Sequence, residues 1–303
     1  MLRSLLLYLS EREGLKNFLS RRALGRRLAA RFIAGENLED AVCAVRALNA
    51  EGFEATLDYL GESVHAEAAA GEASRIYLDV LDRLAAEGLR SHVSIKLTQL
   101  GLAMDEALAR RHLAALCERA ARHRNFIRID MEGSAYTEST LRAFRQAGFS
   151  RNVLGVAIQS YLYRSEKDVE ELVKLGARVR LVKGAYQEPP ELAFPAKADV
   201  DRNFIMLMET LLAGGGYHAI ATHDPKMIAA TLDFARRRGL GRDHFEFQML
   251  YGIRRQLQRN LLRQGFRVRV YVPYGKQWYA YFMRRLAERP ANVIFLLRNL
   301  LRG

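Results

Sequence analysis

Strand-like and helical stretches alternate eight times between Gly52 and the end of the chain, and this regular alternation constrains the fold most strongly. Each strand-like run is short and rich in branched residues, and each is followed by apolar residues spaced three and four apart. Glycine commonly ends the helical stretches, as is typical of helix termini. Because successive parallel strands are joined by helical crossovers, strict alternation predicts a parallel sheet.

The alternation defines eight strand–helix units. The predicted strands are Phe53–Tyr59, His92–Leu97, Phe126–Met131, Val153–Gln159, Arg178–Lys183, His218–Thr222, His244–Leu250 and Arg267–Val272. The predicted helices are Val64–Glu87, Asp105–Arg122, Thr137–Gln146, Ser165–Leu175, Asp199–Ala213, Pro225–Arg238, Ile253–Gln264, Lys276–Glu288 and a last helix, Ala291–Arg302. Eight units over roughly 220 residues fit an α/β fold of the (β/α)8 barrel type. A doubly wound open sheet is the alternative, but no G-x-G-x-x-G follows any strand.

Residues 1–50 are predicted to form a helical arm that precedes a barrel domain of residues 51–303. Apolar residues recur at spacings of three and four throughout this arm. Its last helix is predicted over Leu38–Ala50, where Val42 and Val45 share one face.

The chain carries a net charge of +13, which favours anionic partners such as acidic lipid surfaces, phosphates or nucleic acid. Part of this charge lies on one N-terminal helix, in Arg21, Arg22, Arg26, Arg27 and Arg31. A solvated helix face is the other interpretation of these arginines. A nucleic-acid site would need aromatic residues interleaved with the basic ones, and the helix offers only Phe18 and Phe32. We therefore expect no nucleic-acid partner.

The cysteine content and the apolar runs bear on the compartment. Cys43 and Cys117 cannot form a disulfide framework, and neither has the neighbours of a metal site. No apolar run approaches the ~20 residues of a spanning helix, and the leucines after Met1 are too few for a secretory signal. These features predict a cytoplasmic protein without a bound metal.

Polar residues recur at the carboxyl-terminal ends of the predicted strands. Strand side chains alternate between two faces, so Val93 and Ile95 face the helices and leave Lys96 facing inward. The same alternation, applied from the second strand onward, places six polar residues at one level inside the barrel. They are Lys96, Asp130, Gln159, Arg180, Gln248 and Tyr271. Any one of them could simply extend to water, but six together indicate an active site at the barrel mouth.

The helix after the last strand carries polar residues at spacings i, i+3, i+4 and i+7, which form one face. They are Tyr281, Arg284, Arg285 and Glu288. One interpretation is a surface ion pair between Glu288 and an arginine. The other is a pair of guanidinium groups over the mouth, suited to binding a carboxylate.

With these residues assembled, the chain resembles a proline dehydrogenase of the monofunctional bacterial type and the proline dehydrogenase domain of proline utilization proteins. The resemblance covers about residues 50–300, and its motifs occur in the expected order. They are Ser94–Thr98, Ile129–Glu132, Arg178–Tyr186, Ala221–Asp224, Phe245–Gly252, Tyr271–Gly275 and Arg284–Glu288.

The resemblance implies a distorted (β/α)8 barrel whose final helix lies over the mouth, and FAD bound without a Rossmann fingerprint. It implies FAD contacts from Gln159, Arg180, Val182, Lys183, Gly184, Ala185, Thr222, His223, Gln248 and Glu288. It implies a proline site formed by Lys96, Asp130, Leu250, Tyr271, Tyr281, Arg284 and Arg285. Arg180, Lys96 and Asp130 would be the catalytic residues.

The implied reaction is oxidation of L-proline to 1-pyrroline-5-carboxylate by hydride transfer to flavin N5, the first step of proline catabolism to glutamate. Electrons would pass to membrane quinone, and the basic surface fits peripheral attachment to the inner face of the membrane. Lys96, Arg284 and Arg285 would clamp the substrate carboxylate. Leu250, Tyr271 and Tyr281 would form an apolar wall for the ring, and Arg180 would stabilise negative charge on the flavin.

Three alternatives remain open from the residues. A Schiff-base aldolase or phosphate-binding isomerase on the same barrel would use Lys96 or Lys183 as its amine. A basic nucleic-acid-binding protein would leave the mouth residues unexplained. Within the family, a different cyclic amino acid such as hydroxyproline could be the substrate, and Tyr271 would then screen the ring substituents. The base that deprotonates the substrate amine is not identified by the sequence.

Overall fold

The computed structural model describes residues 30–61 and 63–287. Within them, eight parallel strands form a closed barrel in the order β1 to β8, with β1 paired to β8, as the alternation predicts. The strands are β1 (Glu54–Tyr59), β2 (Ser91–Ile95), β3 (Ile127–Ile129), β4 (Leu154–Gln159), β5 (Arg178–Val182), β6 (His218–Ala221), β7 (Phe245–Leu250) and β8 (Arg267–Tyr274).

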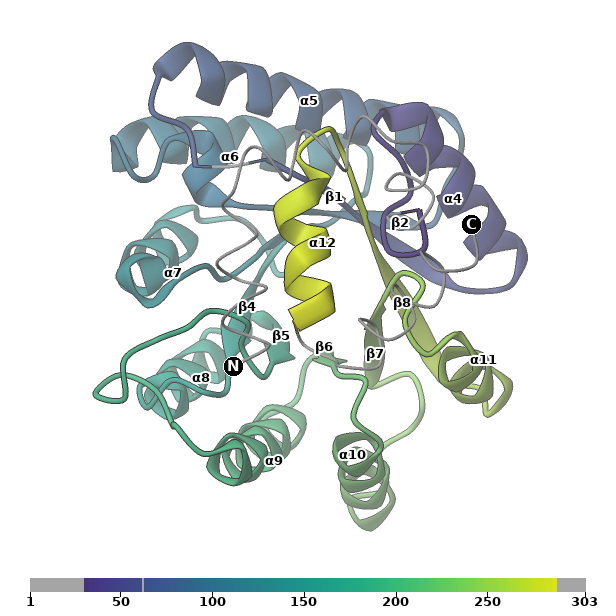
Figure 1. Cartoon of the computed structure of the whole chain (residues 1–303). Coiled ribbons are helices and arrows are strands. Elements are labelled where there is room, and N and C mark those ends of the chain that lie inside the picture. Colours follow the sequence, from purple (N-terminus) through teal and green to yellow (C-terminus); the bar gives the residue numbers. More distant parts are fainter. Residues whose placement is uncertain (1–29, 62, 288–303) are drawn as a thin grey trace, which may run out of the picture.

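Helices surround the barrel, and one of them, α12, lies across its mouth (Figure 1). The α-helices are α4 (Leu38–Ala50), α5 (Glu67–Ala86), α6 (Glu106–Arg122), α7 (Thr137–Gln146), α8 (Ser165–Lys174), α9 (Lys197–Ala213), α10 (Pro225–Arg237), α11 (Arg255–Arg263) and α12 (Trp278–Ala287). The prediction of a final helix over the mouth is confirmed. The helices predicted before residue 30 and over Ala291–Arg302 lie outside the described residues, as does Glu288.

Helix starts follow local side-chain chemistry. Asn37, Asp105 and Asp224 each cap the helix that follows, because their side chains accept a hydrogen bond from a backbone N–H of its first turn. Pro225 occupies the first position of α10, where its missing N–H costs nothing. Local signals of this kind explain why the predicted boundaries agree with the structure to within a few residues.

One boundary difference with a clear cause follows β2. The predicted strand continues to Leu97, but β2 ends at Ile95, and a 3-10 turn, η1 (Leu97–Leu100), comes next. The turn closes at Gly101, which adopts the left-handed conformation with φ 96°. Thr98 within the turn donates from its hydroxyl to the Glu132 carboxylate at 2.6 Å, so a tertiary contact holds the chain out of the strand.

Side chains alternate along each strand between an apolar layer, which packs against the helices, and the polar interior of the barrel. Val93, Ile129 and Phe247 are almost fully buried against the surrounding helices, as the alternation predicts. The residues between them point into the barrel, where Arg180 and Arg269 are both buried. α4 buries Ala41, Val45 and Leu48 in the same core as the strands. The division into an arm and a barrel domain at residue 50 stays a prediction.

A second apolar cluster lies at the mouth. It joins α12 to the loops around it through Phe32, Ile33, Leu60, Ile253, Trp278, Tyr279, Tyr281, Phe282 and Met283. The indole N–H of Trp278 donates to Glu36 at 3.0 Å. α12 is therefore held over the barrel by its own core. In the described part of the chain, no helix has both the length and the hydropathy to cross a bilayer.

Candidate active site

Asp130 lies at the centre of the barrel mouth, directly after β3. Its Oδ2 accepts a hydrogen bond from the Tyr271 hydroxyl at 2.6 Å, and its Oδ1 accepts one from Arg180 Nη1. The Lys96 ammonium lies 3.7 Å from Oδ2. Four residues predicted to share one level, on or just beyond β2, β3, β5 and β8, therefore meet around a single carboxylate.

Arg180 is fixed from several sides. Its Nε donates to Gln248 Oε1 at 2.5 Å, and its Nη1 donates to the Ser94 hydroxyl at 3.0 Å. The guanidinium also lies 5.2 Å from the centroid of the Tyr271 ring. Only 4% of the residue is exposed. Contacts from three other strands and from Asp130 leave the guanidinium little freedom to reorient.

Lys96 has a second, closer carboxylate neighbour that the sequence analysis missed. Asp58 on β1 lies 2.5 Å from the Lys96 ammonium and is 1% exposed. Burial alone would lower the pKa of Lys96, but the Asp58 and Asp130 carboxylates outweigh it and raise that pKa. Extending the alternation to the first strand would have found Asp58, because it has the parity opposite to the outward-facing Ala55 and Leu57.

Tyr271 is held as a hydrogen-bond donor. Burial, followed by the charge of the neighbouring Asp130, raises the pKa of the Tyr271 phenol well above its ordinary value. The Tyr271 hydroxyl therefore stays protonated and donates a hydrogen bond to the Asp130 carboxylate. A phenol in this position presents its ring, rather than a charge, to the space above the barrel.

The exit of β5 contains four of the residues expected to contact a cofactor, Val182–Ala185. The Val182 carbonyl accepts from the Ser160 N–H at 2.8 Å. The Lys183 ammonium lies 2.8 Å from Asp224 and also donates to Asp201. Both acids were missed, since Asp201 lies on α9 and Asp224 follows β6, too far along the chain for spacing to pair them with Lys183.

Gly184 has a conformation and a contact that exclude a side chain. Its φ is 120°, and a Cβ atom built on it would lie 2.4 Å from the Tyr161 ring. Ala185 follows in an exposed position. Further along the same loop, the Glu188 carboxylate accepts from the Ser134 N–H at 2.7 Å and from the Tyr161 hydroxyl at 3.3 Å. The loop after β5 is thus fastened to the loops after β3 and β4.

The neighbouring strand ends supply neutral donors and acceptors. Gln159 is 3% exposed and its amide donates to the Glu132 carbonyl at 2.9 Å. The Thr222 N–H donates to the Gln248 carbonyl at 3.1 Å. His223 Nε2 accepts from the Leu250 N–H at 2.8 Å, which leaves the ring beside the exit of β7. All of these residues lie at the mouth, as predicted.

α12 brings the last predicted residues over this site. Tyr281 is buried beside Leu250, and the Arg285 guanidinium lies 5.1 Å from the centroid of the Tyr281 ring. Arg284 belongs to the same helix, but its side chain lies outside the description, as does Glu288. The choice between a surface ion pair and a carboxylate clamp at this face therefore stays open.

The strand ends carry polar groups of the kind that a flavin ring needs. Arg180, Gln159, Gln248 and Thr222 offer cationic and neutral groups for the carbonyl and ring nitrogen atoms of an isoalloxazine. The backbone at Gly184 packs directly against the Tyr161 ring, which fixes the course of the loop after β5. No phosphate loop of the Rossmann type is needed for such an arrangement.

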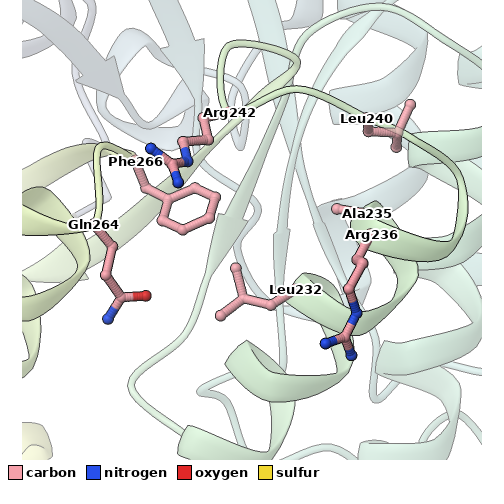
Figure 2. A pocket seen from close by; sticks show the side chains of 7 residues that line it. All are labelled: Leu232, Ala235, Arg236, Leu240, Arg242, Gln264 and Phe266. Atoms are coloured by element: carbon pink, nitrogen blue, oxygen red, sulfur yellow. The ribbon is translucent and has the colours of Figure 1, made fainter.

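Two pockets open on the opposite face, at the amino-terminal ends of the strands. One, of about 370 Å³, lies between the ends of α10 and α11, with Leu232 and Phe266 on its walls (Figure 2). Arg242 lies over the Phe266 ring at 5.6 Å. The other pocket, of about 580 Å³, is lined by residues that include His92 and Arg269. Active sites of (β/α)8 barrels lie at the carboxyl-terminal face, so neither pocket coincides with the expected site.

Comparison with known proteins identifies the family. The family described as proline dehydrogenase matches residues 41–298. The chain is 43% identical to proline dehydrogenase 1 of Bacillus subtilis (strain 168) over 303 residues, which is 100% of both chains. It is also 43% identical to the proline dehydrogenase of Deinococcus radiodurans over 281 residues, 91% of each chain.

A solved structure has the same fold. Proline utilization A from Bdellovibrio bacteriovorus, inactivated by N-propargylglycine, superposes with a TM-score of 0.82 at 25% identity. The match covers 87% of this chain and 33% of that longer protein. By sequence over its whole length and by its barrel fold, the chain belongs to the proline dehydrogenase family of oxidoreductases.

Proposed function

We propose that this protein oxidises L-proline to 1-pyrroline-5-carboxylate with FAD as its cofactor. The observation that carries the proposal is the convergence of Lys96, Asp130, Arg180 and Tyr271 beneath α12. FAD would supply the hydride acceptor at flavin N5. The protein would bind the substrate, orient it and exclude water.

Two groups are suited to the substrate carboxylate. The Lys96 ammonium has three N–H donors, and Asp58 accepts one of them at 2.5 Å. Arg285 lies on α12 with its guanidinium 5.1 Å from the centroid of the Tyr281 ring, and Arg284 precedes it in sequence. An ammonium from the barrel and a guanidinium from the helix would bind the carboxylate from two sides.

Tyr271, Tyr281 and Leu250 would form the wall against the substrate ring. Leu250 packs against the apolar cluster that contains Tyr281, and Tyr271 is oriented by its hydrogen bond to Asp130. Such a wall presents apolar surface to a small saturated ring. Because Tyr271 stands on the barrel side of this space, we expect it to discriminate between proline and hydroxyproline.

Gln159, Arg180, Gln248, Thr222 and His223 would hold the flavin, together with the exit of β5 over Val182–Ala185. Arg180 would stabilise negative charge on the flavin, because its guanidinium is buried and already oriented. Lys183 is neutralised by Asp201 and Asp224. Because both acids are already paired with Lys183, we expect this residue to position the loop after β5 in addition to contacting the cofactor.

The aldolase alternative is disfavoured by the same geometry. A lysine that forms a Schiff base needs a lowered pKa so that its amine is free to attack. The neighbouring carboxylates raise the pKa of Lys96 instead. Family membership also favours oxidation over aldol chemistry.

We further infer that electrons pass to membrane quinone through peripheral contact with the bilayer. The support is the net charge of +13, which favours an anionic lipid surface, and the resemblance to the family. Sedimentation with quinone-containing anionic vesicles, compared with neutral ones, would test this contact. Proline-dependent quinone reduction that is equal on both vesicle types would contradict it.

The decisive experiment for the reaction is an absorption spectrum before and after anaerobic addition of L-proline. Flavin bands that bleach with proline would support cofactor, reaction and substrate together. Bands that bleach with hydroxyproline but not with proline would identify hydroxyproline as the substrate instead. A protein that shows no flavin bands, even after incubation with FAD, would refute the proposal. Replacing Arg180 with Met should reduce flavin content or turnover in the same assay.

A further inference from the structure

Asp58 is a buried carboxylate at the mouth to which the proposed reaction assigns no role. It lies on β1, paired in register with Ser94 of β2 and Pro273 of β8. Its exposure is 1%, and Oδ1 lies 2.5 Å from the Lys96 ammonium. A carboxylate this deeply buried requires a partner that offsets the loss of its hydration.

The second carboxylate near Lys96 is already occupied. Asp130 accepts hydrogen bonds from Arg180 and Tyr271, and it lies 3.7 Å from the Lys96 ammonium, beyond hydrogen-bond distance. Asp58 is therefore the principal counter-ion of Lys96. Among the described residues, Asp58 therefore pairs with Lys96 and Asp130 pairs with Arg180.

Other groups near Lys96 are poorer counter-ions. Tyr186 on the loop after β5 and Glu132 after β3 interact with Lys96 only through longer-range charge. Tyr271 on β8 is a neutral phenol whose proton is directed at Asp130. Arg285 on α12 lies against the Tyr281 ring at 5.1 Å and is a cation, so it cannot serve as a counter-ion. Without Asp58, the Lys96 ammonium would have to share the Asp130 carboxylate with the Arg180 guanidinium.

We propose that Asp58 is a positioning residue for substrate binding: it keeps Lys96 charged and directed into the mouth, where Lys96 can receive the substrate carboxylate. The inference rests on the proposed function, since it assigns the carboxylate to Lys96. Lys96 is 17% exposed in its side chain, so its hydration alone would not keep it protonated. Neutral lysine offers no charge to a carboxylate, and substrate binding would then fail as the pH rises.

The test uses cyclopentanecarboxylate, a ring of the same size with a carboxylate and no amine to titrate. Its affinity for the FAD-loaded protein is measured by isothermal titration calorimetry between about pH 6 and pH 9, in wild type and in Asp58→Asn. Wild-type affinity should stay nearly constant over this range. In the variant we expect affinity to fall with pH and to be about tenfold weaker by pH 9, because a buried lysine without its counter-ion loses its proton.

Proton uptake distinguishes this role from simple loss of packing. Where Lys96 of the variant is neutral, carboxylate binding should draw about one proton from solution, detected as a heat that depends on the buffer. Wild type should draw none. Equal affinities and equal proton uptake in the two proteins would overturn the proposal. A wild-type flavin that proline does not reduce would instead overturn the proposed function, and this inference with it.

Two further variants complete the design. Asp168→Asn removes another buried, ion-paired carboxylate, which lies 2.8 Å from Arg164 on the outer ring and is 4% exposed. It should leave the affinity and its pH dependence unchanged. Asp58→Asn in a Lys96→Gln background should add no further loss of affinity. If Asp58→Asn alone does not fold, this double variant should be more stable than Lys96→Gln, and equal stability would refute the pairing.

Discussion

Glu246 provides a quantitative test of the buried ion pair with Arg269 that lies inside the barrel beneath the mouth residues. It lies on β7 inside the barrel and is 1% exposed. Arg269 donates to it at 2.9 and 3.1 Å, and the Tyr217 hydroxyl donates to it at 3.1 Å. Gln248, which orients Arg180, also donates to this carboxylate. Replacing Glu246 with Gln removes the charge and keeps the shape.

The magnitude follows from the pKa. Burial would raise the pKa of Glu246, but the charge of Arg269 outweighs it and lowers the pKa from 4.5 to about 2. That difference corresponds to about 3 kcal/mol at neutral pH, at the lower end of the roughly 3–5 kcal/mol that breaking a buried ion pair costs. Because the folded pKa is depressed, this stabilisation is present above the unfolded pKa near 4.5 and is lost as the pH falls toward about 2.

Denaturant unfolding of both proteins, with refolding checked, would measure the effect. Near pH 7 we expect Glu246→Gln to lower the free energy of unfolding by about 3 kcal/mol, and at about pH 3 by only about 1 kcal/mol. Glu209→Gln is the control, since its carboxylate pairs with Arg237 at 3.3 Å on the surface and should change stability by less than about 1 kcal/mol. A difference that is independent of pH would refute the assignment to charge.

Three further predictions concern the mouth. Arg285→Met should raise the KM for proline about tenfold or more with flavin content unchanged, as expected for loss of a carboxylate contact; unchanged proline kinetics would argue against the clamp. Gly184→Ala should reduce flavin retention, because its Cβ would lie 2.4 Å from the Tyr161 ring, and a normal flavin content would show that the loop can yield. Tyr271→Phe loses the hydrogen bond to Asp130 and should narrow the preference for proline over hydroxyproline in steady-state kinetics; an unchanged ratio of kcat/KM values would remove that role.

Much of the fold could be predicted because two local rules agree along the whole chain. The period of apolar residues separates strands from helices, and alternation within each strand decides which residues enter the barrel. Lys96 and Arg180 were placed correctly by these rules, since neighbours such as Ile95 and Leu181 could only face the helices. The same rules placed Asp130 and Tyr271 inside the barrel without knowledge of the hydrogen bond between them.

What the sequence could not supply are partners that meet only in three dimensions. Asp201 and Asp224 lie on different elements from Lys183, and no spacing along the chain pairs them with it. Glu188 sits in a loop without periodicity, although it fastens that loop to Ser134 and Tyr161. Asp58 is different, because the same alternation, had it reached the first strand, would have placed it inside.

The division of charge at the mouth has a consequence for how substrate would be recognised. Asp58 and Asp130 neutralise Lys96 and Arg180 almost completely in the absence of substrate. A barrel that is neutral at its mouth exerts little net attraction on a carboxylate, so the additional positive charge has to come from elsewhere. Arg285 is on α12, which an apolar cluster holds over the barrel. Recognition of the carboxylate would therefore depend on the position of α12, whereas most of the groups expected to hold the flavin come from strands β4 to β7 and the segments that directly follow them.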